Sequence, residues 1–169
     1  MTLLRLLFSA SVGCLVLAAC GISRSETLPT VEELTPDRLP QLIRDAKGRA
    51  VIVNVWATWC APCIEEFPDL LRVAQEREAE GVKLILVSTD FKQSLPAVRA
   101  FLAKRGVEGG SYRKTGPDEP FIQALSPDWS GAIPATFVFD GNGKLRRFHE
   151  GKADYAAFTQ MVTDTLGKP

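Results

Sequence analysis

The sequence predicts an α/β domain with a mixed central sheet flanked by helices. An apolar, β-branched run at residues 50–57 precedes a helical pattern at 61–79, and a second such run follows at 82–88. Strand, helix and strand of these lengths form a βαβ unit, so we expect the two strands to be parallel. Residues 135–140 and 144–150 are typical of two strands around a Gly-Asn-Gly turn, which makes an antiparallel hairpin.

The other elements follow from local signals. Thr35-Pro36 resembles a helix N-cap with a first-turn proline, which predicts a helix to about Lys47. Ser94 is predicted to cap a helix that ends near Lys104. Further along, we expect a short helix at residues 117–125, a loop at 126–132 and a closing amphipathic helix at 154–166. The 20 basic and 20 acidic residues balance, so we expect no nucleic-acid partner.

The N-terminus has the pattern of an export signal. Arg5 precedes an apolar run at residues 6–17, which is too short to span a bilayer core of about 30 Å. The run ends in Leu-Ala-Ala-Cys20, which resembles the lipobox of bacterial lipoproteins. We therefore expect cleavage before Cys20 and a lipid on that cysteine, in preference to plain secretion.

This reading divides the chain into three parts: a signal peptide at 1–19, the lipidated cysteine and a flexible tether at 20–34, and one folded domain at 35–169. The tether is mostly polar and lacks a sustained apolar period. Cys60 and Cys63 are then the two cysteines of the folded domain. An exported protein that keeps only such a pair is predicted to use it for exchange. We expect a monomer.

Cys60 and Cys63 lie where the first predicted strand gives way to the long helix. Disulfide exchange needs a thiolate nucleophile and a second thiol that resolves the mixed disulfide. At a helix start, unpaired N–H groups lower the pKa of a thiol, which predicts Cys60 as the nucleophile and Cys63 as the more buried resolving thiol. Pro62 falls in the first turn, where its missing donor costs little.

The sequence gives less support to two other uses of the pair. A zinc site would need two more ligands, and the mature chain offers only His149 and a lipidated Cys20. A structural disulfide between Cys60 and Cys63 would close a very short loop and gain little stability from closure. Redox exchange is therefore the preferred prediction, with the cysteine pair itself as the redox centre and no metal or other cofactor.

The residues around the pair resemble a known family. The segment 53–63 reads VNVWATWCAPC, residues 66–68 read EFP, and residues 131–138 read GAIPATFV. Together they resemble the TlpA/ResA-like branch of the thioredoxin superfamily, over roughly residues 35–166. The resemblance implies a thioredoxin-like fold with a central insertion, here within about residues 91–132.

The resemblance also implies a function. It is that of a membrane-anchored oxidoreductase of the bacterial cell envelope, whose catalytic domain faces the periplasm or the exterior. Its expected work is to reduce disulfides in exported proteins, such as apocytochrome c. A membrane thiol carrier would supply the electrons.

Residue roles carry over from the matching motifs. The resemblance implies a cis peptide bond at Ile133-Pro134 that faces the cysteines, with the Ile133 backbone free to pair with an extended substrate. We expect Trp59 and Pro62 to contact substrate as well. Glu66 matches the glutamate of a Cys-x-x-Glu-x-Pro pattern and is expected to tune the thiols.

Helical periodicity supports this role, because it places Glu66 at the edge of the apolar arc and Glu65 nearly opposite it. Thioredoxin itself has a buried aspartate at the position of Asn54. An amide cannot titrate, so we expect Asn54 to satisfy local backbone groups. The single histidine, His149, is expected to be a surface residue.

Two other functions remain as alternatives. A peroxiredoxin-like thiol peroxidase needs a Pro-x-x-x-Thr/Ser-x-x-Cys frame, and no proline occupies that place before Cys60. A Cu(I)-binding thioredoxin-like chaperone usually has three residues between its cysteines, whereas this chain has two. Two thiolates can still bind Cu(I), since soft ligands favour that ion.

Overall fold

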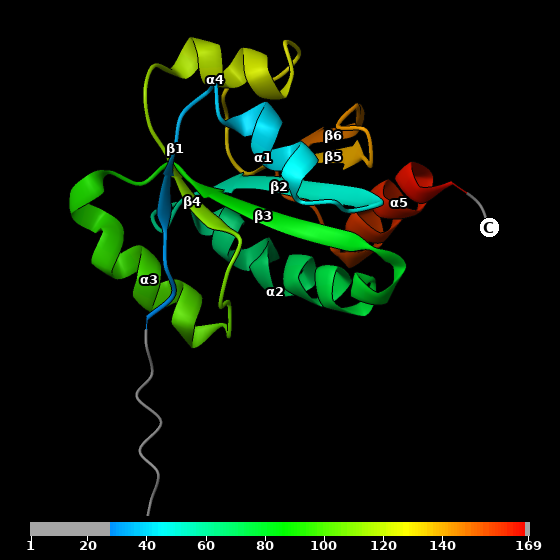
Figure 1. Ribbon diagram of the computed structural model, residues 1–169. Coiled ribbons are helices and arrows are strands. Elements are labelled where there is room, and N and C mark those ends of the chain that lie inside the picture. The colour runs from blue at the N-terminus through cyan, green and yellow to red at the C-terminus, as the bar shows by residue number, and fades with distance from the viewer. Residues whose placement is uncertain (1–27, 168–169) are drawn as a thin grey trace, which may run out of the picture.

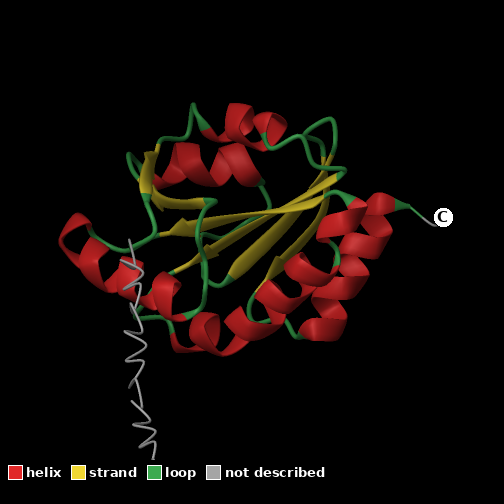
Figure 2. Cartoon of the chain, turned by 60° about the horizontal axis from the view of Figure 1, so that its bottom comes forward, coloured by secondary structure: helices red, strands yellow, loops and turns green. Residues whose placement is uncertain are grey.

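The computed structural model describes residues 28–167, which form a six-stranded sheet with helices on both faces (Figures 1 and 2). The strands are β1 (Glu32–Leu34), β2 (Ala50–Trp56), β3 (Val82–Ser88), β4 (Ser111–Lys114), β5 (Ala135–Asp140) and β6 (Leu145–Glu150). The helices are α1 (Leu39–Asp45), α2 (Ala61–Glu76), α3 (Leu95–Lys104), α4 (Asp118–Leu125) and α5 (Tyr155–Leu166). Cys20 and the predicted signal peptide lie outside the described residues.

The sheet is mixed, as predicted, in the order β1-β4-β3-β2-β5-β6. The neighbours β2 and β3 are parallel, and the hairpin β5–β6 is antiparallel, so both predicted pairings are confirmed. All seven residues of β2 are buried. This burial explains the continuous apolar pattern of the strand, because helices cover both of its faces.

Two hydrophobic layers enclose the sheet. On one face, α2, α3 and α5 contribute side chains such as Phe67, Leu102 and Phe158. On the other face, α1 and α4 contribute side chains such as Ile43 and Phe121. Figure 2 shows the two groups of helices on opposite sides of the strands. Because β2 and α2 are both packed into these layers, the cysteines at the amino end of α2 have a fixed position.

Two predictions near the chain's first elements are wrong, and one strand further along was not predicted. The first helix starts at Leu39 and not at Thr35, because residues 35–38 form a turn in which the Thr35 carbonyl accepts the Arg38 N–H. Glu32–Leu34, predicted as the end of the tether, form the edge strand β1, and Leu34 is fully buried. Strand β4 was not predicted at all. Strands β1 and β4 are short, and β1 pairs with β4 at the edge of the sheet, which local apolar periodicity does not reveal.

The remaining elements agree with the prediction to within a few residues. Helix α2 ends at Glu76 and is followed by a 3-10 turn, Glu78–Glu80, which stops at Gly81 with a positive φ of 86°. Ser94 occupies the N-cap position of α3 but makes no capping bond, whereas the Asp154 side chain caps α5 by accepting the Ala157 N–H. Among residues 28–167, no helix is both long and apolar enough to cross a membrane.

Candidate active site

Cys60 and Cys63 form a disulfide at the amino end of α2. Cys60 is the N-cap residue, and its Sγ accepts the Cys63 N–H at 3.3 Å. Cys60 is 5% exposed and Cys63 is 0% exposed, so the predicted difference in burial is confirmed. The unpaired N–H groups and the positive end of the helix dipole favour a thiolate at this position once the disulfide is reduced.

A buried carboxylate holds the loop that leads into Cys60. Asp90 is 2% exposed and accepts the Thr58 N–H at 2.9 Å and the Thr58 hydroxyl at 2.5 Å. The Ser88 hydroxyl donates to the same carboxylate at 2.7 Å. These bonds join the loop before Cys60 to the end of β3, and sequence analysis missed them. The available signal was a pair of polar residues just after a buried parallel strand, where functional sites of α/β folds collect.

The Ile133–Pro134 peptide bond is cis, as predicted. Pro134 is buried directly before β5, and its carbonyl accepts the Gly151 N–H at 2.8 Å. Ile133 is half-buried and lines the same cleft as Trp59. The structure therefore brings the two separated sequence motifs to one side of the molecule.

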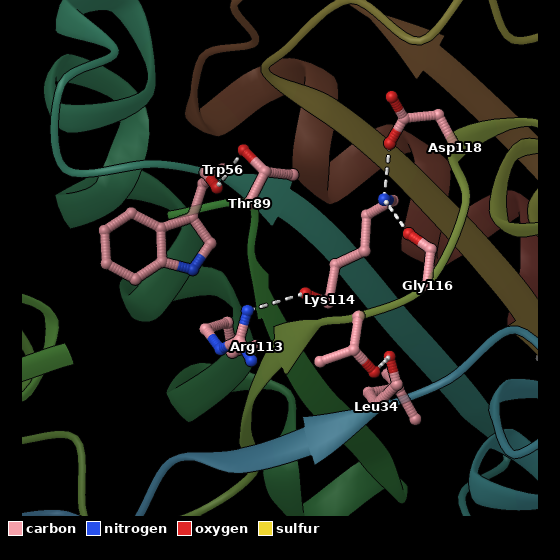
Figure 3. Close-up of polar contacts among 8 residues, drawn as sticks. Leu34, Trp56, Thr89, Arg113, Lys114, Gly116 and Asp118 are labelled. Atoms are coloured by element: carbon pink, nitrogen blue, oxygen red, sulfur yellow. Dashed lines mark hydrogen bonds and ion pairs between the residues drawn. The ribbon is translucent and has the colours of Figure 1, made fainter. Parts of the chain in front are cut away.

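That cleft has a volume of about 780 Å³ and an aromatic rim. The rim is formed by Trp59 and Phe91, which are 65% and 69% exposed. Its lining also includes polar groups: Lys114 pairs with Asp118 and donates to the Gly116 carbonyl at 3.2 Å (Figure 3). Large exposed aromatic side chains offer apolar contact area to a binding partner.

Glu66 is 1% exposed and lies inside the domain, on the α2 side of the sheet. Its Oε1 accepts the Asn54 Nδ2–H at 2.9 Å, and its Oε2 accepts the Ala153 N–H at 2.8 Å. Asn54 also donates to the Thr136 hydroxyl at 3.0 Å, so its partners are side chains and not the backbone groups predicted for it. Burial raises the pKa of Glu66, although both hydrogen bonds oppose that shift.

The neighbouring carboxylate behaves differently, as helical periodicity predicted. Glu65 is exposed and pairs with Lys152 at 2.6 Å. Pro62 is exposed in the first turn of α2, beside the disulfide. The predicted substrate contacts Trp59, Pro62 and Ile133 thus lie on the same part of the surface as the cleft or directly next to the cysteines.

Glu66→Gln is expected to move the pH profile of thiol alkylation in the reduced protein to lower pH. Glu66 lies one helical turn after Cys63, and an ionised carboxylate there raises the pKa of a nearby thiol. Burial raises the pKa of Glu66, and charge interaction with the thiols would couple the two titrations. The matched control, Glu65→Gln, removes an exposed charge and should leave the profile unchanged. Identical profiles for Glu66→Gln and wild type would show that Glu66 does not tune the thiols.

Known proteins are similar to this chain in sequence. The Redoxin family model matches residues 24–163. HelX of Rhodobacter capsulatus, a thiol:disulfide interchange protein, is 35% identical over 120 residues, which are 70% of this chain and 62% of the relative. The DsbE homolog of Paracoccus denitrificans is 30% identical over 151 residues, which are 84% of this chain and 70% of the relative.

The thiol-disulfide oxidoreductase ResA of Bacillus subtilis is 31% identical over 61% of this chain and 54% of its own length. The chain thus spans 54% to 70% of the length of these three relatives.

A solved structure gives the same result for the fold. The thioredoxin-family thiol:disulfide interchange protein from Chlorobium tepidum superposes with a TM-score of 0.61 at 27% identity, covering 83% of this chain and 99% of that one. The fold is therefore thioredoxin-like. With the family match over most of its length and a Cys-x-x-Cys pair at the start of α2, the chain belongs to the Redoxin family and is related to its thiol–disulfide oxidoreductases ResA, DsbE and HelX.

Proposed function

We propose that this protein is an extracytoplasmic thiol–disulfide oxidoreductase that reduces disulfides in exported proteins, apocytochrome c being one such substrate. The observation that carries the proposal is the disulfide between Cys60 and Cys63 at the start of α2, beside a cleft with exposed aromatic side chains. The relatives named as thiol:disulfide interchange proteins support the reaction class.

The reaction starts from the reduced dithiol. The Cys60 thiolate attacks one sulfur of the substrate disulfide, forming a mixed disulfide and releasing the other substrate sulfur as a thiolate, which takes up a proton. The Cys63 thiol then loses its proton and attacks the Cys60 sulfur, which closes the protein disulfide and releases the second substrate sulfur as a thiolate that takes up a proton. Two electrons pass to the substrate, and a membrane thiol carrier restores the dithiol. The cysteine pair carries the electrons, so the reaction requires no other cofactor.

The surface around the disulfide suits an extended protein segment. Trp59 and Phe91 offer apolar contacts at the rim of the cleft, and Ile133 is among its lining residues. In this proposal the Ile133 backbone, next to the cis bond, pairs with substrate backbone in the manner of an added strand. Buried Glu66 serves as the proton-exchanging group near the thiols, a role that the amide of Asn54 cannot fill.

The anchor is part of the proposal. A lipid on Cys20 would hold the domain in the bacterial cell envelope, close to a membrane electron donor, and the domain would act as a monomer. Cys20→Ser is expected to abolish both lipid labelling and membrane retention, while dithiol activity of the purified protein stays unchanged. Continued sedimentation of the variant with membranes would contradict the lipobox interpretation.

Cys63→Ala tests the proposed function directly. Without its resolving thiol, Cys60 should remain joined to the substrate as a mixed disulfide. Isolation of the complexes from cells, followed by mass spectrometry, should identify exported proteins that contain cysteines. The matched control is the double variant Cys60→Ala/Cys63→Ala, which should trap nothing. Trapping of cytoplasmic proteins alone, or peroxide consumption without disulfide reduction, would overturn the proposal.

A further inference from the structure

His149 and Glu66 contact opposite ends of one peptide group. The Nε2 of His149 lies 3.3 Å from the Lys152 carbonyl oxygen. The N–H of that same peptide unit belongs to Ala153 and donates to Glu66 Oε2 at 2.8 Å. The half-buried imidazole on β6 is thereby connected to the buried carboxyl on α2 through a single amide.

The sheet makes a second connection on the same face. His149 is the register partner of Thr136 on β5, and Thr136 is the register partner of Asn54 on β2. Residues in such a row point to the same side of the sheet. Asn54 donates to both Thr136 and Glu66. The row therefore ends on the oxygen of Glu66 that the peptide group does not use.

We propose that His149 is a positioning residue that sets the proton affinity of Glu66 through the Lys152–Ala153 peptide group. A protonated imidazole donates its Nε2–H to the Lys152 carbonyl. This donation polarises the amide and strengthens the bond from Ala153 to the Glu66 carboxylate, because linked hydrogen bonds reinforce one another. The charge state of Glu66 thus follows the protonation of a side chain that reaches solvent.

The electrostatics agree with this geometry. Burial is the largest influence on the pKa of Glu66 and raises it, whereas positive charge on His149 lowers it. Imidazole is the side chain whose charge changes between about pH 5 and 8. Protonation of His149 therefore favours the ionised carboxylate.

The other charged groups near Glu66 form ion pairs or hydrogen bonds with groups other than Glu66. On α2, Glu65 pairs with Lys152, and Asp69 accepts the Tyr155 N–H at 3.2 Å. On the His149 side of β6, Arg147 pairs with Asp164 of α5 at 3.0 Å. Lys152 is the other cation that lowers the pKa of Glu66, but it is exposed, and its side chain is not part of the amide connection. It therefore provides a matched control.

The Ala153 amide is a direct reporter for the test, since its N–H donates a hydrogen bond to Glu66. In the oxidised, 15N-labelled protein, we expect its chemical shift to titrate in two steps, one for each group. His149→Gln keeps a side-chain donor but cannot take a charge. It should leave one step, displaced to higher pH because Glu66 loses a favourable positive charge. Lys152→Gln should keep both steps.

Glu66→Gln provides the reciprocal test and should leave only the step due to His149. A wild-type titration with one step that His149→Gln does not displace would overturn the inference. So would loss of a step in Lys152→Gln. Only the role of this coupling in disulfide reduction rests on the proposed function. The coupling itself is tested by the titration, which uses oxidised protein without substrate. A protein that shows the coupling but reduces no disulfide would contradict the proposed function alone.

Discussion

Cys60→Ser is expected to reduce catalysed disulfide reduction to the uncatalysed level. Cys60 is at the N-cap of α2, where the helix favours a thiolate, and a serine hydroxyl cannot take its place as the attacking group. Cys63→Ser should still form the mixed disulfide but fail to turn over, because the resolving thiol is missing. Turnover of a disulfide-bonded protein substrate with an excess of dithiol donor measures the difference.

Alkylation of the reduced protein gives an independent measure of the same asymmetry. At mildly acidic pH, a small alkylating reagent should label Cys60 well before Cys63, which is fully buried. Mass spectrometry after proteolysis separates the two labels. The roles assigned to the cysteines would be reversed if Cys63 reacted first, and equal labelling would remove the basis for either assignment.

The cysteine site was predictable because its signals are local in the chain. A buried strand, the Cys-x-x-Cys pair and the start of an amphipathic helix follow one another within residues 50–76. The hairpin of β5 and β6 is local in the same way, since a short turn joins its strands. In contrast, β1 pairs with β4 across about 80 residues, and neither strand has an apolar pattern of its own.

At Glu66, too, the features set by local sequence were predictable and those set by distant contacts were not. Helical periodicity distinguished Glu66 from Glu65, because the burial of one helix face depends on positions within that helix. Its hydrogen-bond partners were not predictable from periodicity. Asn54 lies 12 residues earlier and Ala153 lies 87 residues later, and only the complete fold brings them together. His149, expected to be a surface residue, is half-buried on β6.

Asp90→Ala is expected to destabilise the protein by about 3 kcal/mol, because each buried donor that loses its acceptor costs roughly 1 to 3 kcal/mol. The donors are the Thr58 N–H, the Thr58 hydroxyl and the Ser88 hydroxyl. The hydroxyls can turn toward other acceptors, which limits the total. Asp90→Asn keeps one acceptor oxygen and should lose less. Denaturant-induced unfolding of the oxidised protein measures the stabilities of wild type, Asp90→Ala and Asp90→Asn.

Asp118→Ala is the matched control for Asp90→Ala. Both aspartates line the cleft, but the Asp118 side chain is 84% exposed and its pairing with Lys114 lies at the surface, where such pairs contribute little to stability. Asp90→Ala should also slow alkylation of Cys60 in the reduced protein, since Thr58 lies two residues before the nucleophile and Asp90 fixes its backbone. Equal stability losses for the two variants would show that the buried carboxylate does not hold this loop. A large loss for Asp90→Ala with an unchanged alkylation rate would limit Asp90 to a role in folding.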